Sequence, residues 1–168
     1  MQIPLQLPPQ LEDAPAWIQW LQTSGLGNLI RSGKWPYPSI EIVHLVGLIL
    51  VFGSVLVVNL RIFGHVLRST PVAEAARELA PVTRTGLGLQ VLSGPLMFIT
   101  SAVRFYGNVQ FRVKLVLLFA ALVYHFAVHR PLTFQAGAPI AKLRKSAAFS
   151  LVMWSAVVLA GLSIELLN

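Results

Sequence analysis

One stretch limits the fold more than any other. Residues 39–64, SIEIVHLVGLILVFGSVLVVNLRIFG, are almost entirely apolar between Glu41 and Arg61. An α-helix rises about 1.5 Å per residue, so a stretch of this length spans the ~30 Å hydrocarbon core of a bilayer. A helix also satisfies its backbone polar groups internally, which hydrocarbon requires. The sequence therefore predicts a transmembrane helix over about 42–60, with one ionisable ring, His44, near its start.

Three further apolar stretches, at 86–103, 111–130 and about 147–164, have the length of a membrane span. The stretch at 86–103 contains Pro95, which predicts a kink in its helix. The chain as a whole is 55% hydrophobic and only 11% charged, a composition that water would not keep in solution. We therefore expect an all-α integral membrane protein, in which residues 39–168 form a bundle of four transmembrane helices.

The residues before the first span have a different character. Trp17, Leu21, Leu26 and Ile30 recur near helical spacing, and the segment is rich in the aromatic residues that favour the headgroup zone, Trp20, Trp35 and Tyr37 among them. This pattern predicts an interfacial amphipathic helix within an N-terminal segment, residues 1–38. A docking surface for an external partner is the alternative. The first residues lack the pattern of a cleaved signal peptide, so we expect none.

The orientation follows from Lys and Arg, which are enriched in cytoplasmic loops. Eight of the 13 fall in segments 61–85 and 129–146: Arg61, Arg68, Arg77, Arg84, Arg130, Lys142, Arg144 and Lys145. The other five are Arg31, Lys34, Arg104, Arg112 and Lys114. This bias predicts a multi-pass protein of the bacterial cytoplasmic membrane with both termini outside. The net charge of +7 then attracts anionic lipid, and the basic residues are not clustered with exposed aromatic residues as nucleic-acid binding would require.

The four histidines are candidate metal ligands, because an imidazole within hydrocarbon needs a hydrogen-bond partner or a metal. His125 lies ~21 Å along the third span from Phe111, so His44 and His125 are expected in opposite halves of the bilayer. His125 and His129 are four residues apart on one helical face, and His65 is also on the inner side. The alternatives are a hydrogen-bonded interfacial role for His44 and ordinary flanking roles for His65 and His129. Arg61 is a positive flank or a partner for an anion such as a haem propionate.

Three short motifs carry a resemblance to a known family. They are E-x-x-H at Glu41 to His44, L-R-x-x-G at Leu60 to Gly64, and F-R-x-K at Phe111 to Lys114. With a glycine-rich second span, they resemble a family of small, functionally uncharacterised bacterial four-helix membrane proteins, over about Trp17 to the end of the chain. That family usually has Asp before the L-R pair, where this chain has Asn59, so no carboxylate role carries over to this position.

A more distant similarity links His44 and the third-span K-L…Y-H to the HemJ-type protoporphyrinogen oxidases and the CopD-type copper-resistance proteins. The resemblance implies a haem-binding bundle, with His44 as the first-helix histidine and with Lys114 and His125 as the third-helix basic positions. Neutral imidazole is a good axial ligand for haem iron. Met97 and Lys114 lie at a suitable depth for the second ligand near His44, although core packing and snorkelling explain them equally well.

The leading hypothesis is a haem b-binding protein that moves electrons within the membrane, as an anchor subunit of a larger oxidoreductase or as a homo-oligomer, with quinone as a further cofactor. The first alternative is a HemJ-like porphyrinogen oxidase. The second is a cofactor-free accessory subunit or a copper-handling permease. The chain has three Met and no Cys, which disfavours a copper path.

Overall fold

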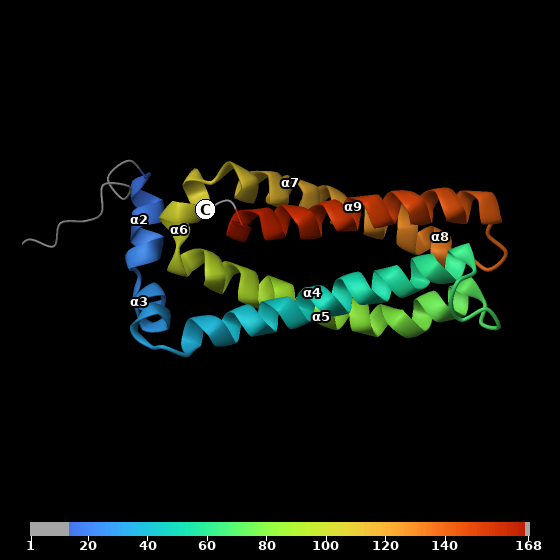
Figure 1. Ribbon diagram of the computed structural model, residues 1–168, viewed down its shortest axis with the longest axis horizontal. Helices are drawn as coiled ribbons and strands as arrows, with labels where there is room; N and C mark the ends of the chain where they lie inside the picture. The colour runs from blue at the N-terminus through green and yellow to red at the C-terminus, as the bar shows by residue number, and fades with distance from the viewer. Residues whose placement is uncertain (1–13, 167–168) are drawn as a thin grey trace, which may run out of the picture.

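A computed structural model describes residues 14–166, and every regular element in this range is a helix. Residues 1–13 and 167–168 lie outside the described residues, so the first part of the predicted N-terminal segment does too. The all-α prediction is confirmed. Four long helical segments lie side by side along the long axis of the molecule (Figure 1). They are α4 (Pro36–Phe63), α5 (Val72–Thr100), α7 (Val109–Tyr124) continued by η1 (His125–His129) and α8 (Arg130–Phe134), and α9 (Ile140–Leu166).

The long helices form two antiparallel hairpins. α5 packs along α4, and α9 packs along α7, while α4 and α9 join the two hairpins. At one end α8 also contacts α5. We call this the loop end, because it carries the turns at 64–71 and 135–139. The opposite end, which carries α2, α3 and α6, is the cap end (Figure 1).

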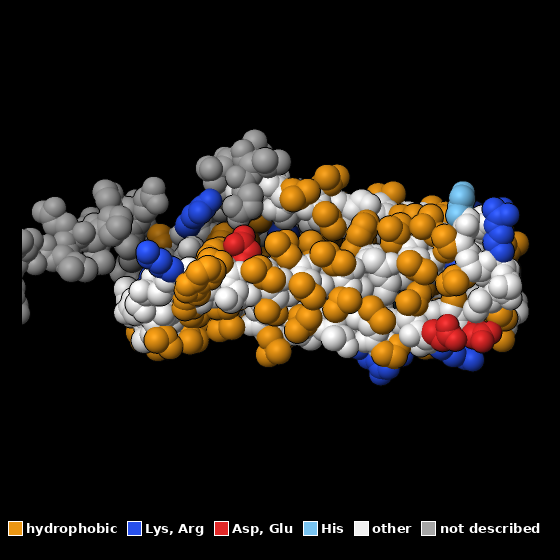
Figure 2. Space-filling model, turned by 60° about the horizontal axis from the view of Figure 1, so that its bottom comes forward, with side chains coloured by type: hydrophobic (Ala, Val, Ile, Leu, Met, Phe, Trp, Pro, Cys, Tyr) orange, Lys and Arg blue, Asp and Glu red, His pale blue; other side chains and the backbone are white. Residues whose placement is uncertain are grey.

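Three of the long segments, Pro36–Phe63, Val109–Phe134 and Ile140–Ile164, are long and apolar enough to cross a membrane. Among the described residues, these are the three candidate spans of a multi-pass membrane protein. Figure 2 agrees with this division, because hydrophobic side chains cover the length of the bundle and most charged side chains lie near its ends. α5 is long enough but not apolar enough, since it includes Arg84 and Gln90 as well as two prolines.

The second helix differs from its predicted bounds of 86–103. It begins at Val72 and ends at Thr100, and a short helix, α6 (Ala102–Gly107), follows. The early start has a local cause, because the AEAARELA run at 73–80 is rich in helix formers and Glu74 lies in the first turn, where the helix dipole favours a carboxylate. Arg77 and Arg84, which the sequence analysis placed in a loop, therefore lie on a helix.

The core follows the contacts between the hairpins. Val51 and Val55 of α4 pack with Ala121 of α7 and with Trp154 and Val157 of α9. A second cluster lies nearer the loop end and joins α4, α5 and α9.

Two glycines let α4 and α5 approach closely. A Cβ placed on Gly86 would lie 2.8 Å from the carbonyl oxygen of Gly47, and one on Gly47 would lie 3.0 Å from the oxygen of Gly86. Small residues at such crossings are the usual basis of close helix packing in membranes.

The predicted amphipathic segment forms two short helices, α2 (Ala16–Thr23) and α3 (Gly25–Ser32), which lie across the cap end (Figure 1). Ile18 is fully buried against α6, while Trp17, Trp20 and Trp35 are exposed. Arg31 ties this layer to the bundle, because its Nη1 donates to the carbonyl oxygen of Thr100 at 2.8 Å. Arg31 thus places a positive charge and a hydrogen-bond donor at the C-terminus of α5, where the helix dipole favours a cation.

Candidate functional site

His44 lies in α4 toward the cap end and faces α5. Its Nδ1 is 2.9 Å from the Ser93 hydroxyl, and that hydroxyl donates its proton to the carbonyl oxygen of Leu89 at 2.6 Å. Because Ser93 has a single proton, His44 Nδ1 must be the donor in the first bond. Gln90 Nε2 also donates to the carbonyl oxygen of His44 at 3.0 Å. The neutral imidazole is therefore held in one tautomer, with the lone pair on Nε2.

Lys114 approaches His44 from the other hairpin. It belongs to α7, is partly buried, and lies against Gly161 of α9, where a Cβ would come within 3.4 Å of the Lys114 Nζ. Its charge acts electrostatically on His44. Met97 lies one turn after Ser93 on α5, partly buried, and its carbonyl oxygen accepts from Thr100 Oγ1 at 2.6 Å. We refer to His44, Ser93, Gln90 and Lys114 as the His44 site.

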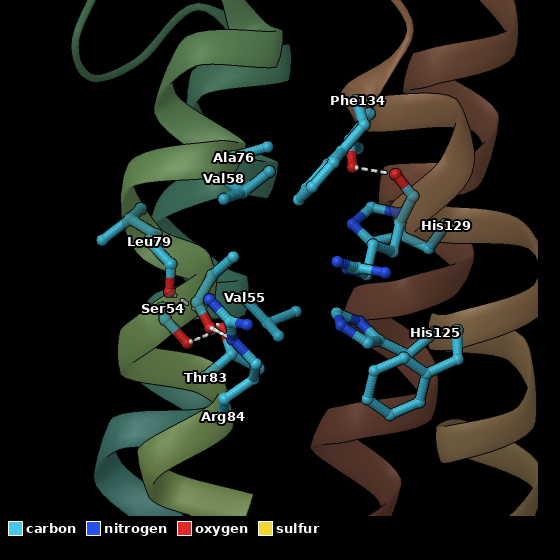
Figure 3. Close-up of a pocket in the computed structure, with 14 residues that line it drawn as sticks. Ser54, Val55, Val58, Ala76, Leu79, Thr83, Arg84, His125, His129 and Phe134 are labelled. Atoms are coloured by element: carbon cyan, nitrogen blue, oxygen red, sulfur yellow. Dashed lines mark hydrogen bonds between the residues drawn. The ribbon is translucent and has the colours of Figure 1, made fainter.

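A pocket opens between the hairpins nearer the loop end (Figure 3). It is small and open to the outside, and it is lined by residues of α4, α5, η1 and α8. Its polar lining consists of Ser54, Thr83, Arg84, His125, His129, Arg130 and Thr133. Figure 3 shows His125 and His129 pointing from their helix toward α5, across the space from Ser54, Thr83 and Arg84. We call this the histidine pocket.

The rings of the two pocket histidines lie side by side at a tilt of 40° and are held differently. Their ring centroids are 5.8 Å apart. His129 Nδ1 is 3.0 Å from the Ser146 hydroxyl, which also accepts from the Tyr124 hydroxyl at 3.0 Å. His125 is 8% exposed and contacts Trp154 edge to face, but its Nδ1 is buried without a hydrogen-bond partner among the described residues. Of the two, His129 alone has a fixed ring orientation.

The closeness of His125 and His129 has a backbone cause. They form the two ends of η1, a π-helical turn in which the Arg130 N–H donates to the carbonyl oxygen of His125, five residues back. Pro131 follows, and it has no N–H and a ring that clashes with a preceding carbonyl in a regular α-helix. The wider turn relieves that clash. Such π-turns within α-helices are frequent at functional sites.

The remaining candidate ligands lie elsewhere. His65 is exposed in the 64–71 turn and does not line the histidine pocket. The Arg61 Nε donates to the carbonyl oxygen of Thr70 at 2.5 Å, which fastens that turn to α4. The structure thus brings His125 to His129 and leaves His65 and Arg61 outside the pocket.

His44 is at a different level. It precedes Ser54, which lines the pocket, by ten residues on α4, which corresponds to ~15 Å along the axis. Both pocket histidines come from one helix, so they do not face each other across a porphyrin. Among the described residues, no group of three or more His, Cys, Asp or Glu is placed to hold a metal ion. Neither level therefore places two histidines of this chain on opposite sides of one planar cofactor.

Sequence reasoning missed several of these residues. Arg84 and Arg130 were counted as flanks of the spans, yet both line the histidine pocket. Ser93 and Ser146, the hydroxyls that hold His44 and His129, were not recognised as partners. Pro131, two residues after the H-x-x-x-H pair, was a usable signal for η1. No sequence signal identified Ser93 as a partner, because its contact with His44 joins two helices.

The fold and these two sites define a helical bundle with polar sites between apolar helices. The chain belongs to a family of unknown function, DUF6644, whose model matches residues 17–166. No curated protein and no solved structure matches it. The expected membership in a functionally uncharacterised family agrees with this match, and the similarity to HemJ-type and CopD-type proteins remains a prediction.

Proposed function

We propose that this DUF6644 protein is a haem b-binding membrane protein, an electron-transfer or anchor subunit of a larger oxidoreductase. In this proposal α5 joins the three apolar segments as a fourth span, so that the bundle crosses the membrane four times. The loop end lies in the bacterial cytoplasm and α2 and α3 lie in the outer interface. Haem b supplies reversible one-electron chemistry at its iron.

The observation that carries the proposal is the Ser93 contact of His44. Metal-bound histidines almost always donate their other ring N–H to a fixed acceptor, which sets the tautomer. His44 Nδ1 has such an acceptor in Ser93 at 2.9 Å, and Ser93 is itself fixed by Leu89. The Nε2 lone pair is therefore available to iron, which is the fit expected of an axial ligand.

Lys114 of the opposite hairpin is close enough to His44 for its charge to act on the imidazole, and it becomes a candidate second ligand only in its deprotonated form. The pairing of a first-helix histidine with a third-helix lysine is also what the resemblance to HemJ-type proteins implies. A membrane porphyrinogen oxidase is therefore the second candidate function. Oxidation of added porphyrinogen by the purified protein distinguishes it from an electron-transfer subunit.

The first test is the absorption spectrum of the purified protein and of its His44→Ala variant. We expect a Soret band in the wild type and its loss or shift in the variant, because the axial ligand is removed. His65→Ala is the matched control, since His65 is exposed in a turn, and it should leave the spectrum unchanged. Purified wild-type protein without a Soret band, under conditions that retain haem in other membrane cytochromes, would refute the proposal.

His125→Ala tests the assignment of levels. Because His44 lies ~15 Å along α4 from Ser54, which shares a pocket with His125, we expect this variant to keep the spectral component that His44→Ala removes. Loss of one and the same haem in both variants would show that the level assignment is wrong.

A further inference from the structure

We propose that the histidine pocket binds the phosphate group of an anionic phospholipid from the leaflet at the loop end. The inference is independent of haem binding, because it uses different residues at a different level of the bundle. It rests on the charge of the pocket lining, on the donors that the lining offers and on where its mouth opens.

The lining is cationic without any compensating carboxylate. Arg84 comes from α5 and Arg130 from α8, and no acidic residue lies among the described residues that line the pocket. Cations within a bundle of membrane-spanning helices normally pair with an anion. Two guanidinium groups on opposite sides of one pocket are suited to a phosphate, because each presents a fork of donors to its oxygens.

His125 adds a donor. Its Nδ1 is buried and has no hydrogen-bond partner among the described residues. A buried N–H without an acceptor is rarer than a buried acceptor without a donor, so the favoured neutral tautomer carries its proton on Nε2. Figure 3 shows the ring pointing toward the pocket. The pocket thus offers an N–H and two cations, which together complement an oxyanion.

Both arginines lean toward the loop end. The Arg84 Nε donates to the carbonyl oxygen of Ala80, which is one turn nearer that end of α5, at 3.4 Å. The Arg130 guanidinium lies over the ring of Phe134, 4.6 Å from its centroid, at the end of α8. Long basic side chains that snorkel in this way place their charge near the headgroup layer. Basic pockets between helices on the cytoplasmic side are recognised headgroup sites.

The mouth faces the side of the bundle. Arg84 and Phe126 both line the pocket and are themselves exposed, and Phe126 is 45% accessible. The walls include Val55, Val58 and Leu79, which suit the first carbons of an acyl chain. An opening bounded by apolar side chains on the membrane-facing surface admits a lipid more readily than a free ion. We therefore assign the occupant to the lipid phase.

Native mass spectrometry of the full chain in neutral detergent tests the proposal, with phosphatidylglycerol and phosphatidylcholine as probes. We expect one phosphatidylglycerol to bind at least tenfold more tightly than phosphatidylcholine. The double variant Arg84→Gln/Arg130→Gln should lose this preference. Arg144→Gln/Lys145→Gln, which changes two exposed charges near the same end outside the pocket, should keep it.

Ala80→Phe is a second variant that keeps every charge and fills the pocket, which Ala80 lines. This variant should also lose the preference for phosphatidylglycerol. It tests the proposal even if the double arginine variant does not fold. Equal binding of the two lipids by the wild type overturns the proposal, as does unchanged preference in Ala80→Phe. If inorganic phosphate at millimolar concentration abolishes lipid binding in the wild type, the site is one for a free anion and the lipid assignment is wrong. None of these outcomes bears on the Soret band.

Discussion

The role of each polar residue inside the bundle depends on the neighbour that the fold gives it. His44 and His129 both contact a serine hydroxyl through Nδ1, at 2.9 and 3.0 Å. His125, which has the same side chain and lies on the same helical face as His129, has a buried Nδ1 without a partner among the described residues. In the two proposals, His44 is accordingly a metal ligand, whereas His125 donates to the anion in its pocket.

The role of Ser93 is testable at this scale. Ser93→Ala removes the acceptor of His44 Nδ1 and leaves the ring free to turn. We expect haem affinity to fall by about 10–100-fold, the usual effect of losing such an outer partner. Haem titration of the apoprotein, followed by its Soret band, measures this change. Ser163→Ala is the control, because Ser163 Oγ donates only within its own helix, to the carbonyl oxygen of Ala160. Equal affinities in the Ser93 variant and the wild type would contradict the tautomer argument.

A second buried polar contact involves Asn59, where the family resemblance leads one to expect Asp. Asn59 is fully buried, its Nδ2 donates to Ser150 Oγ at 3.3 Å, and its Oδ1 has no partner among the described residues. Ser150→Ala should lower the free energy of unfolding by about 1–3 kcal/mol, because the amide loses its acceptor. Asn59→Leu/Ser150→Ala should recover most of this loss. Denaturant titration of the detergent-solubilised variants provides the measurement, and a double variant no better than the single one would disprove the explanation.

At the scale of the element, α7, η1 and α8 form one candidate span, Val109–Phe134, with a local defect. The defect sets the spacing of His125 and His129, and Pro131 explains it. α5 remains a continuous helix although Pro81 and Pro95 lie inside it and remove two backbone donors. Both segments border the histidine pocket or the His44 site. The π-turn therefore coincides with a polar site.

Replacing Pro131 tests this coincidence. Pro131→Ala restores a backbone N–H and removes the steric clash, so a regular α-helix becomes available to residues 125–134. We expect slower amide hydrogen exchange in this segment and weaker binding of phosphatidylglycerol, because the two histidines leave the positions that η1 gives them. Pro139→Ala, in the α8–α9 turn, is the matched control and should change neither quantity. Unaltered exchange at residues 125–131 in Pro131→Ala would mean that Pro131 is not the cause of η1.

For the whole molecule, the two-hairpin arrangement puts both connecting turns at one end and α2 and α3 at the other (Figure 1). The Lys and Arg bias predicts that the loop end lies in the cytoplasm, with eight of the 13 residues in the segments that lead to it. The changed bounds of the second helix do not alter this prediction, because Arg77 and Arg84 lie in the half of α5 near that end.

Cysteine labelling checks the topology without background, since the chain has no cysteine. Ser69→Cys and Ala136→Cys place exposed thiols in the two loop-end turns, and Ser32→Cys places one at the cap end. Gly137 is unsuitable because its φ of +74° would strain any other residue. We expect an impermeant reagent added to intact cells to label Ser32→Cys alone. Labelling of Ser69→Cys or Ala136→Cys from outside would reverse the proposed orientation.

The sequence by itself determined that this protein is helical and that it has long apolar segments suited to a membrane, because the length and hydrophobicity of a segment are local properties. The separation of His44 from the inner histidines was also predictable, since a constant rise per residue fixes depth along a helix. The bounds of the second helix were not predictable, because its polar first half lacks the hydrophobicity that marks a membrane span.

Only the tertiary structure decided which residues meet. The bond between His44 and Ser93 joins residues 49 positions apart, and Arg84 and His125 share a pocket although they belong to different hairpins. Helical period reports which face a residue occupies but not which face of another helix it meets. The partners of the histidines therefore follow from the way the hairpins pack.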